Sequence, residues 1–280
     1  MPLYHTEAGT VETLEWGDGP EVLILLHAAA TGPRSLAALA ERLAAPGRRI
    51  VAPALHGYGA TLMRDAADRL HAHVRVVEAC MRQHDAERRV LFGHSMGGLV
   101  ALLAVMAGAP VGELVLYEPI VIACLRDDDP ADVACRAWDR AIVRAVQTAI
   151  AAGTAEAGIA RFIEAWNETP WSTLPAALRA RMVANASELV AEIAAVSFCP
   201  LDPRALATIA TEVRLLQGAD SPEITRRMTS RLGGILPRAQ RTVMVGTGHM
   251  GPVQAPDRVA RVFLSNRPST PGPAGILGQP

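Results

Sequence analysis

The sequence predicts an α/β fold with a mostly parallel central sheet and helices on both faces of that sheet. One reason is that short apolar runs alternate along the chain with segments of helical spacing. Another is that these runs are continuously apolar, as expected for strands that are buried on both sides. Such sheets bind ligands at the carboxyl ends of their strands, where the chemically informative residues of this chain fall.

The first half of the chain supplies most of the predicted strands. Alternating residues before the turn Gly17-Asp18-Gly19-Pro20 predict an opening strand or hairpin at 10–16. Apolar runs predict buried strands at 22–26, 50–55, 90–92 and 114–117. Segments of helical spacing lie between them at 35–44, 68–83 and 96–108. After a long interruption the alternation resumes, with strands at 213–216 and 242–245 and helices at 224–236 and 253–266.

The interruption, residues 120–208, contains helical patterns and no convincing strand. Asp129 followed by Pro130 is typical of a helix start, because proline suits the first helical position. A later helix places four apolar residues on one face: Ile159, Phe162, Ile163 and Trp166. A third is expected from Pro175 to about Val196, with a break near Asn185.

These patterns predict the domain organisation. Residues 1–119 and 209–267 are expected to form the core, and residues 120–208 a helical lid or cap inserted into it. Residues 268–280 are rich in proline and glycine and predict a disordered tail.

Composition narrows the class of protein. With a net charge of −1 the chain lacks the basic field that a nucleic-acid partner would need, so none is expected. No uninterrupted apolar run is long enough to span a membrane. The four cysteines lie far apart and the N-terminus lacks a signal-peptide pattern, so a cytoplasmic protein is expected. No metal-ligand spacing and no phosphate or dinucleotide fingerprint is present, so neither a metal nor a cofactor is predicted. The oligomeric state stays open.

The most informative motif is Gly93-His94-Ser95-Met96-Gly97, which follows a predicted strand and precedes a predicted helix. Gly-x-Ser-x-Gly in this context is typical of a nucleophile elbow, in which a serine stands on a sharp turn at the sheet edge. The flanking glycines let strand and helix approach closely. A five-residue pattern also occurs by chance, so the interpretation depends on partners elsewhere in the chain.

A serine hydroxyl needs a base within hydrogen-bond reach to become a nucleophile at neutral pH. His249 is the best candidate among eight histidines, because it follows the last predicted strand in the glycine-flanked loop 246–251. On a mostly parallel α/β sheet of this kind, a catalytic serine, an acid and a histidine follow one another in that order along the chain. Ser95 and His249 fit the first and last places of this order.

These residues resemble those of the α/β-hydrolase family over nearly the whole chain. Gly93 to Gly98 is similar to the family's nucleophile elbow, and Gly248-His249 to its histidine loop. The resemblance implies an oxyanion hole formed by the main-chain N–H groups of Met96 and Ala29. Ala28 stands where the family usually has glycine, so the path of the loop from His27 to Ala30 stays open.

Two carboxylates compete to be the triad acid. Asp220 follows the strand after which the family usually carries it, but Ser221 occupies the expected register. Glu118 follows the predicted strand 114–117, a position from which some members of the family draw their acid. We favour Glu118, with Asp220 as the alternative.

The resemblance implies a serine hydrolase that cleaves a small carboxylic ester through an acyl-enzyme. Its expected partner is a small-molecule substrate, an apolar acyl or ester compound. A cofactor-free lyase, an acyltransferase, a haloperoxidase-like enzyme or a C–C bond hydrolase on the same scaffold stays open. A non-catalytic ligand-binding protein is the third hypothesis, against which an intact pair of Ser95 and His249 argues.

Overall fold

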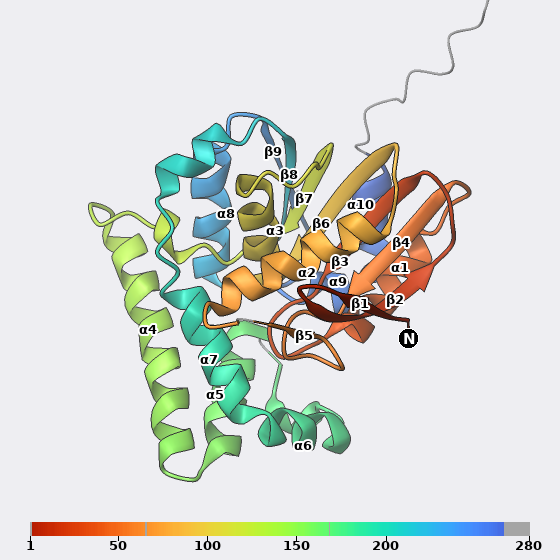
Figure 1. The fold of residues 1–280 in the computed structure, drawn as a ribbon. Helices are drawn as coiled ribbons and strands as arrows, with labels where there is room; N and C mark the ends of the chain where they lie inside the picture. The colour runs from red at the N-terminus through yellow and green to blue at the C-terminus, as the bar shows by residue number, and fades with distance from the viewer. Residues whose placement is uncertain (1, 65, 168, 266–280) are drawn as a thin grey trace, which may run out of the picture.

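A computed structural model describes residues 2–64, 66–167 and 169–265 (Figure 1). The expected disorder of residues 268–280 lies outside these ranges. The strands are β1 (Leu3–Thr6), β2 (Gly9–Trp16), β3 (Glu21–Leu26), β4 (Arg48–Pro53), β5 (Leu62–Met63), β6 (Arg88–His94), β7 (Glu113–Tyr117), β8 (Glu212–Gly218) and β9 (Ala239–Met244). The helices are α1 (Ala37–Leu43), α2 (Arg69–Gln83), α3 (Met96–Met106), α4 (Pro130–Ala151), α5 (Ala155–Asn167), α6 (Ala176–Ala184), α7 (Ala186–Ser197), α8 (Glu223–Ile235), α9 (Gly251–Gln254) and α10 (Pro256–Ser265).

The described strands form one sheet in the order β1-β2-β4-β3-β6-β7-β8-β9, with β5 paired to β2. β4, β3, β6, β7, β8 and β9 are parallel to one another, and β1, β2 and β5 run antiparallel to their neighbours. The predicted α/β class with a mostly parallel sheet is therefore confirmed.

Both faces of the sheet are covered, which explains the continuously apolar strands. In β3, Leu23 and Leu25 pack with residues of α1 and α10 on one face. Val22 and Ile24 pack with residues of α2, α3 and α8 on the other face. Because successive side chains of a strand point to opposite faces, both sets of side chains of β3 are buried, and residues 22–26 are all apolar.

The predicted start of one strand was wrong, and two short strands were not predicted. β9 begins at Ala239, three residues before the predicted start, because β9 is an edge strand and its first residues carry partly or fully exposed side chains. The short strands β1 and β5, which were not predicted, also lie on the periphery, on the side of β2. A peripheral strand lacks the buried apolar pattern that marks a central one.

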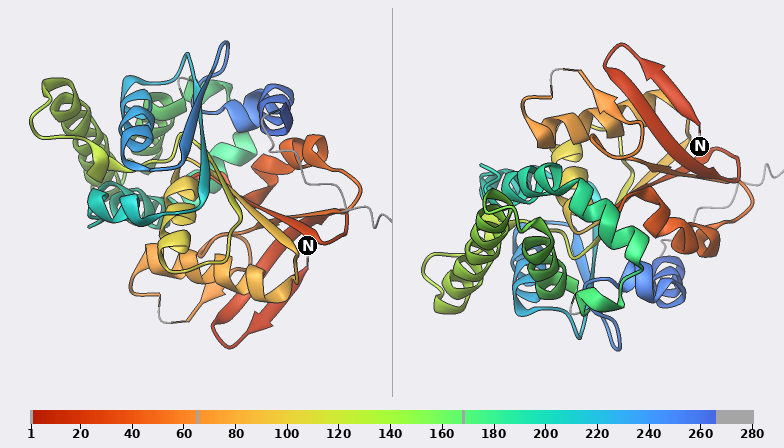
Figure 2. Two further views of the ribbon diagram at one scale, coloured as in Figure 1. Left: turned by 90° about the horizontal axis from the view of Figure 1, so that it is seen from above. Right: turned by 90° about the horizontal axis from the view of Figure 1, so that it is seen from below.

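The chain between β7 and β8 forms the helices α4, α5, α6 and α7, which lie together beside the sheet (Figure 1). Both views of Figure 2 show these green to cyan helices apart from the red antiparallel strands. Asp129 caps α4 by accepting hydrogen bonds from the N–H groups of Ala131 and Asp132, at 3.0 and 3.2 Å, as the sequence predicts. The predicted break at Asn185 separates α6 from α7.

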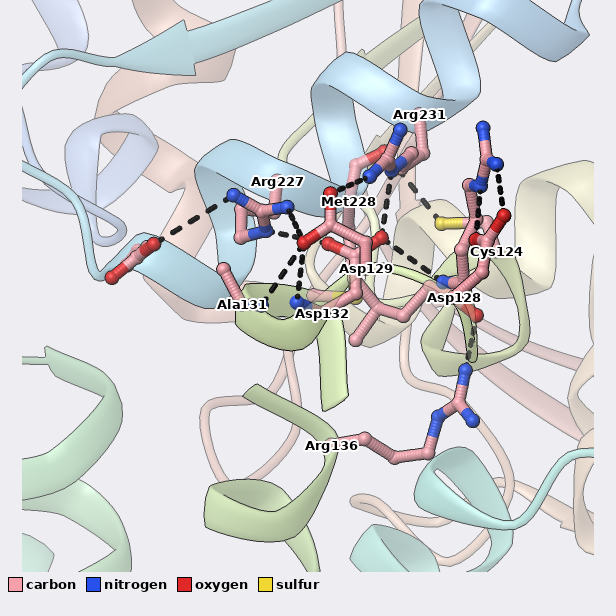
Figure 3. Close-up of polar contacts among 12 residues, drawn as sticks. Cys124, Asp128, Asp129, Ala131, Asp132, Arg136, Arg227, Met228 and Arg231 are labelled. Carbon is pink, nitrogen blue, oxygen red and sulfur yellow. Dashed lines mark hydrogen bonds and ion pairs between the residues drawn. The ribbon is translucent and has the colours of Figure 1, made fainter. Parts of the chain in front are cut away.

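The start of α4 is held to α8 by an arginine–aspartate cluster formed by Asp129, Asp132, Arg227 and Arg231 (Figure 3). Asp132 is 0% exposed and accepts from Arg227 Nε at 2.5 Å, Arg231 Nε at 2.7 Å and the Arg126 N–H at 3.0 Å. Burial opposes ionisation of Asp132, but these hydrogen bonds outweigh it and lower the pKa of the carboxyl. Asp132 is therefore a charged and fully satisfied structural residue.

Replacing Asp132 by alanine is expected to destabilise the protein by about 3 kcal/mol, because Arg227 and Arg231 would each lose the buried one of their carboxylate partners, although both would keep Asp129. Urea unfolding at pH 7 measures this loss. Asp128→Ala is the matched control, since Asp128 pairs with Arg126 on the exposed surface and should contribute less than about 1 kcal/mol. Equal losses in the two variants would contradict a special role for the buried cluster.

Candidate active site

Ser95 stands at the turn between β6 and α3. Its φ of 57° and ψ of −119° are strained for a residue with a side chain. The Ser95 N–H donates to the Tyr117 carbonyl at 3.0 Å, which ties the turn to β7. A side chain at Gly97 would place its Cβ 2.4 Å from the Leu26 carbonyl oxygen, so only glycine lets α3 start this close to β3.

His249 lies in the loop after β9 and faces Ser95. Its Nε2 is 3.1 Å from Ser95 Oγ, and both residues are buried. Two side chains hold the loop in place: His94 Nε2 donates to the His249 carbonyl at 2.8 Å, and Tyr117 Oη donates to the Gly248 carbonyl at 2.7 Å. Burial lowers the pKa of His94 to about 3, so its ring is neutral and carries its proton on the nitrogen that faces the carbonyl.

Glu118, not Asp220, lies beside His249. Glu118 Oε2 is 2.8 Å from His249 Nδ1, and Oε1 accepts from the Gly218 N–H at 2.7 Å. Glu118 is 0% exposed and has a positive φ of 44°, so the backbone is strained where it delivers this carboxylate. Asp220 is exposed, and its N–H donates to the Thr247 carbonyl at 3.0 Å. The geometry therefore favours Glu118 over Asp220 as the partner of His249.

The loop from His27 to Ala30 lies beside Ser95, and Ala28, Ala29 and Met96 line the same cavity as Ser95. Buried His27 fixes the loop: its Nδ1 donates to the Ala28 carbonyl at 2.9 Å, and its Nε2 accepts from the Leu55 N–H at 3.2 Å. Burial lowers the pKa of His27 to about 4, which keeps the ring neutral in this donor–acceptor role.

The two predicted oxyanion-hole donors remain unused within the part of the chain that the structure describes. Among the described residues, the N–H groups of Ala29 and Met96 have no hydrogen-bond acceptor. Met96 is the first residue of α3, and the first N–H groups of a helix have no partner within it. Both groups are thus free to donate to a bound molecule.

Sequence reasoning missed a polar link between this loop and α7. The Ala30 N–H donates to Tyr58 Oη at 2.8 Å, and that hydroxyl donates to Glu192 Oε2 at 2.5 Å. His73 Nε2 lies 3.6 Å from the other oxygen of Glu192. The four residues come from distant parts of the chain, so no local sequence pattern predicts this link.

The cavity beside Ser95 has a volume of about 40 Å³, enough for a few water molecules. The helices α4, α5 and α7 contribute an apolar wall: Val143, Phe162, Ile163, Trp166, Ile193 and Val196. The rings of Trp166 and His249 are 5.8 Å apart. Trp166 and its neighbours on the predicted apolar face of α5 therefore form part of the site.

One ionisable side chain interrupts this apolar wall. Asp139 of α4 is 1% exposed and lines the cavity. Ser197 Oγ lies 3.2 Å from its Oδ1, while Oδ2 has no hydrogen-bond partner among the described residues. Burial raises the pKa of Asp139 to about 6, although Ser197 and the charge of Arg140 oppose this shift.

No group of three or more His, Cys, Asp or Glu side chains in residues 2–64, 66–167 and 169–265 is arranged to hold a metal ion. Within the same residues, every helix is too short or too polar to cross a membrane.

The raised pKa of Asp139 predicts a pH-dependent cost. An unfolded aspartate titrates near pH 3.9, so between about pH 4 and pH 6 the folded protein binds more protons and its stability falls as the pH rises. Asp139→Asn removes this cost. The variant is expected to exceed the wild-type unfolding free energy by roughly 2 kcal/mol more at pH 7 than at pH 4. Urea unfolding across this pH range measures the difference, and a pH-independent difference would refute it.

Solved structures with similar folds are numerous but distant in sequence. An esterase from Exiguobacterium antarcticum has a TM-score of 0.73 and 14% identity over 94% of this chain and 97% of its own. A bromoperoxidase from Bacillus anthracis has a TM-score of 0.70 and 12% identity over 91% and 94%. An alpha/beta hydrolase from Sphaerobacter thermophilus DSM 20745 has a TM-score of 0.64 and 20% identity over 94% and 98%.

No curated protein sequence matches the chain. The family model of the alpha/beta hydrolases, in contrast, matches residues 23–262, which include the elbow, the helices beside the sheet and the histidine loop. On this match, together with the sheet order and the serine turn described above, the chain belongs to the alpha/beta hydrolase family.

Proposed function

We propose that the protein is a serine hydrolase that cleaves a small carboxylic ester. The observation that carries this proposal is the hydrogen-bonded series Ser95–His249–Glu118, in which both ring nitrogens of His249 have a partner at 3.1 Å or less. In this role Ser95 is the nucleophile, His249 the general base and Glu118 the acid that orients the imidazole.

Acylation begins when His249 Nε2 takes the proton of Ser95 Oγ, which attacks the ester carbonyl carbon. The carbonyl oxygen becomes an oxyanion, which the free N–H groups of Ala29 and Met96 stabilise. His249 then passes its proton to the leaving alkoxide, and the alcohol departs from the acyl-enzyme. Glu118 stays ionised throughout and stabilises the transient imidazolium.

Deacylation repeats these steps with water. His249 deprotonates the water, which attacks the acyl carbon and regenerates the oxyanion. The tetrahedral intermediate collapses, Ser95 recovers its proton from His249, and the carboxylic acid leaves.

The surroundings of Ser95 support a small and largely apolar substrate. The cavity is small and its wall is mostly apolar, which favours an ester over a large anionic substrate. We further propose that α4, α5 and α7 act as a lid that keeps bulk water from the acyl-enzyme. The four cysteines are unpaired, which supports the cytoplasm as the site of action.

Ser95→Ala should abolish hydrolysis of short-chain p-nitrophenyl esters, with a loss in kcat/KM of at least about 10⁴-fold, because it removes the hydroxyl that forms the acyl-enzyme. Initial rates measured by absorbance give this value. Mass spectrometry of the wild-type protein after reaction with a fluorophosphonate provides the control and should place one adduct on Ser95. An active Ser95→Ala variant, or an adduct on another residue, would exclude Ser95 as the nucleophile.

Glu118→Gln and Asp220→Asn separate the two candidate acids. Glu118→Gln keeps the shape of the side chain but removes the charge that stabilises the imidazolium, so kcat should fall by about 10⁴-fold. Asp220→Asn should retain nearly the wild-type rate, since Asp220 is exposed. Steady-state kinetics with the same esters decide between them. The reverse ranking would transfer the role to Asp220.

A further inference from the structure

Asp139 and Asp132 lie seven residues apart on α4 and are both buried, yet the protein treats them differently. Asp132 accepts hydrogen bonds from two arginines and a main-chain N–H. Asp139 has one hydrogen-bond partner in the described part of the chain, the neutral Ser197, and its other carboxylate oxygen has none there. A buried carboxyl that the protein leaves half satisfied lowers stability, so its presence calls for a role outside the packing of the helices.

The location of Asp139 indicates that its role is in ligand binding. Asp139, Ser95 and His249 line one small cavity, so a single small molecule can reach the carboxyl and the nucleophile together. Most of the remaining wall is apolar or aromatic, with Phe162 and Trp166 among its members, and Asn167 and Ser197 are the other polar residues that line it. In such surroundings a buried carboxylate discriminates strongly between ligands with and without a hydrogen-bond donor. A ligand that lacks a donor leaves the carboxylate unpaired, at a cost in binding free energy.

We propose that Asp139 is the specificity-determining residue of this cavity and binds a hydrogen-bond donor, an ammonium or a hydroxyl group, carried by the substrate. Oδ2 accepts the hydrogen bond, while Ser197 keeps Oδ1 in place. An ammonium group gains charge pairing as well, and the nearby aromatic rings favour a cation. The proposal deepens the proposed function and rests on it for the identity of the ester substrate.

Isosteric esters test the proposal, because each series differs only in the donor. Methyl butanoate, methyl 3-hydroxypropanoate and methyl 3-aminopropanoate carry a methyl, a hydroxyl and an ammonium group in the acyl part. Propyl acetate and 2-hydroxyethyl acetate make the same comparison in the alcohol part. Dissociation constants come from ligand-observed NMR on the Ser95→Ala protein, which cannot turn the esters over, and KM and kcat come from pH-stat assays on the active enzyme.

In at least one series the donor-bearing ester should bind about 10- to 100-fold more tightly than its methyl isostere, with the difference in KM more than in kcat. Asp139→Asn, which retains an acceptor but no charge, should lose the preference for ammonium and keep part of that for hydroxyl. Asp139→Leu should lose both. Arg144→Gln, on the exposed side of the same helix, is the matched control and should keep the wild-type preference.

The outcomes are distinguishable. Equal or undetectable binding of donor-bearing and methyl esters in both series, or a preference that survives in Asp139→Leu, would overturn the proposal and leave a bound water as the partner of Asp139. Preferential binding that depends on Asp139, without turnover by the wild-type enzyme, would overturn ester hydrolysis and uphold the binding role. Circular dichroism confirms that each variant is folded before its binding is compared.

Discussion

The imidazole of His249 sets the constraint on which the rest of the site depends. The ring must reach a serine after β6 and a glutamate after β7 at once, although it arrives from a loop after β9. The main chain of that loop is therefore held by the side chains of His94 and Tyr117, each adjacent to a proposed triad residue. The segments that follow β6, β7 and β9 thus fix one another at the carboxyl ends of the strands. The strained backbone of Ser95 and Glu118 is the energetic cost of this arrangement.

Much of the fold could be predicted from the sequence because burial on both faces leaves a simple signature. The central strands, the capped start of α4 and the break at Asn185 follow from apolar runs, Asp129-Pro130 and local helix signals. β9 was misplaced because its exposed edge carries polar residues such as Gln240 and Arg241. The signal is therefore strongest where two layers cover a strand and weakest at the margins of the sheet.

The candidate site divides in the same way. Ser95 and His249 stand in local glycine-flanked motifs, and the structure brings them together as those motifs predict. The sequence could not decide between Glu118 and Asp220, because the choice depends on which carboxylate lies beside His249 Nδ1. That contact is made between loops far apart in the sequence, and only the structure shows that it involves Glu118. Tyr58, Glu192 and Asp139 carry no motif, because their significance comes from contacts between helices and loops that no spacing along the chain records.

The arginine–aspartate cluster has a consequence for the cavity that it does not touch. Asp132 and Asp139 are separated along α4 by about 10 Å, two turns of an uninterrupted helix. Because α4 is continuous between the two residues, a displacement of its start at Asp132 would also shift the Asp139 carboxyl at the cavity wall. Substitutions in the arginine–aspartate cluster are therefore expected to change which molecules the enzyme binds, although every residue that lines the cavity stays the same.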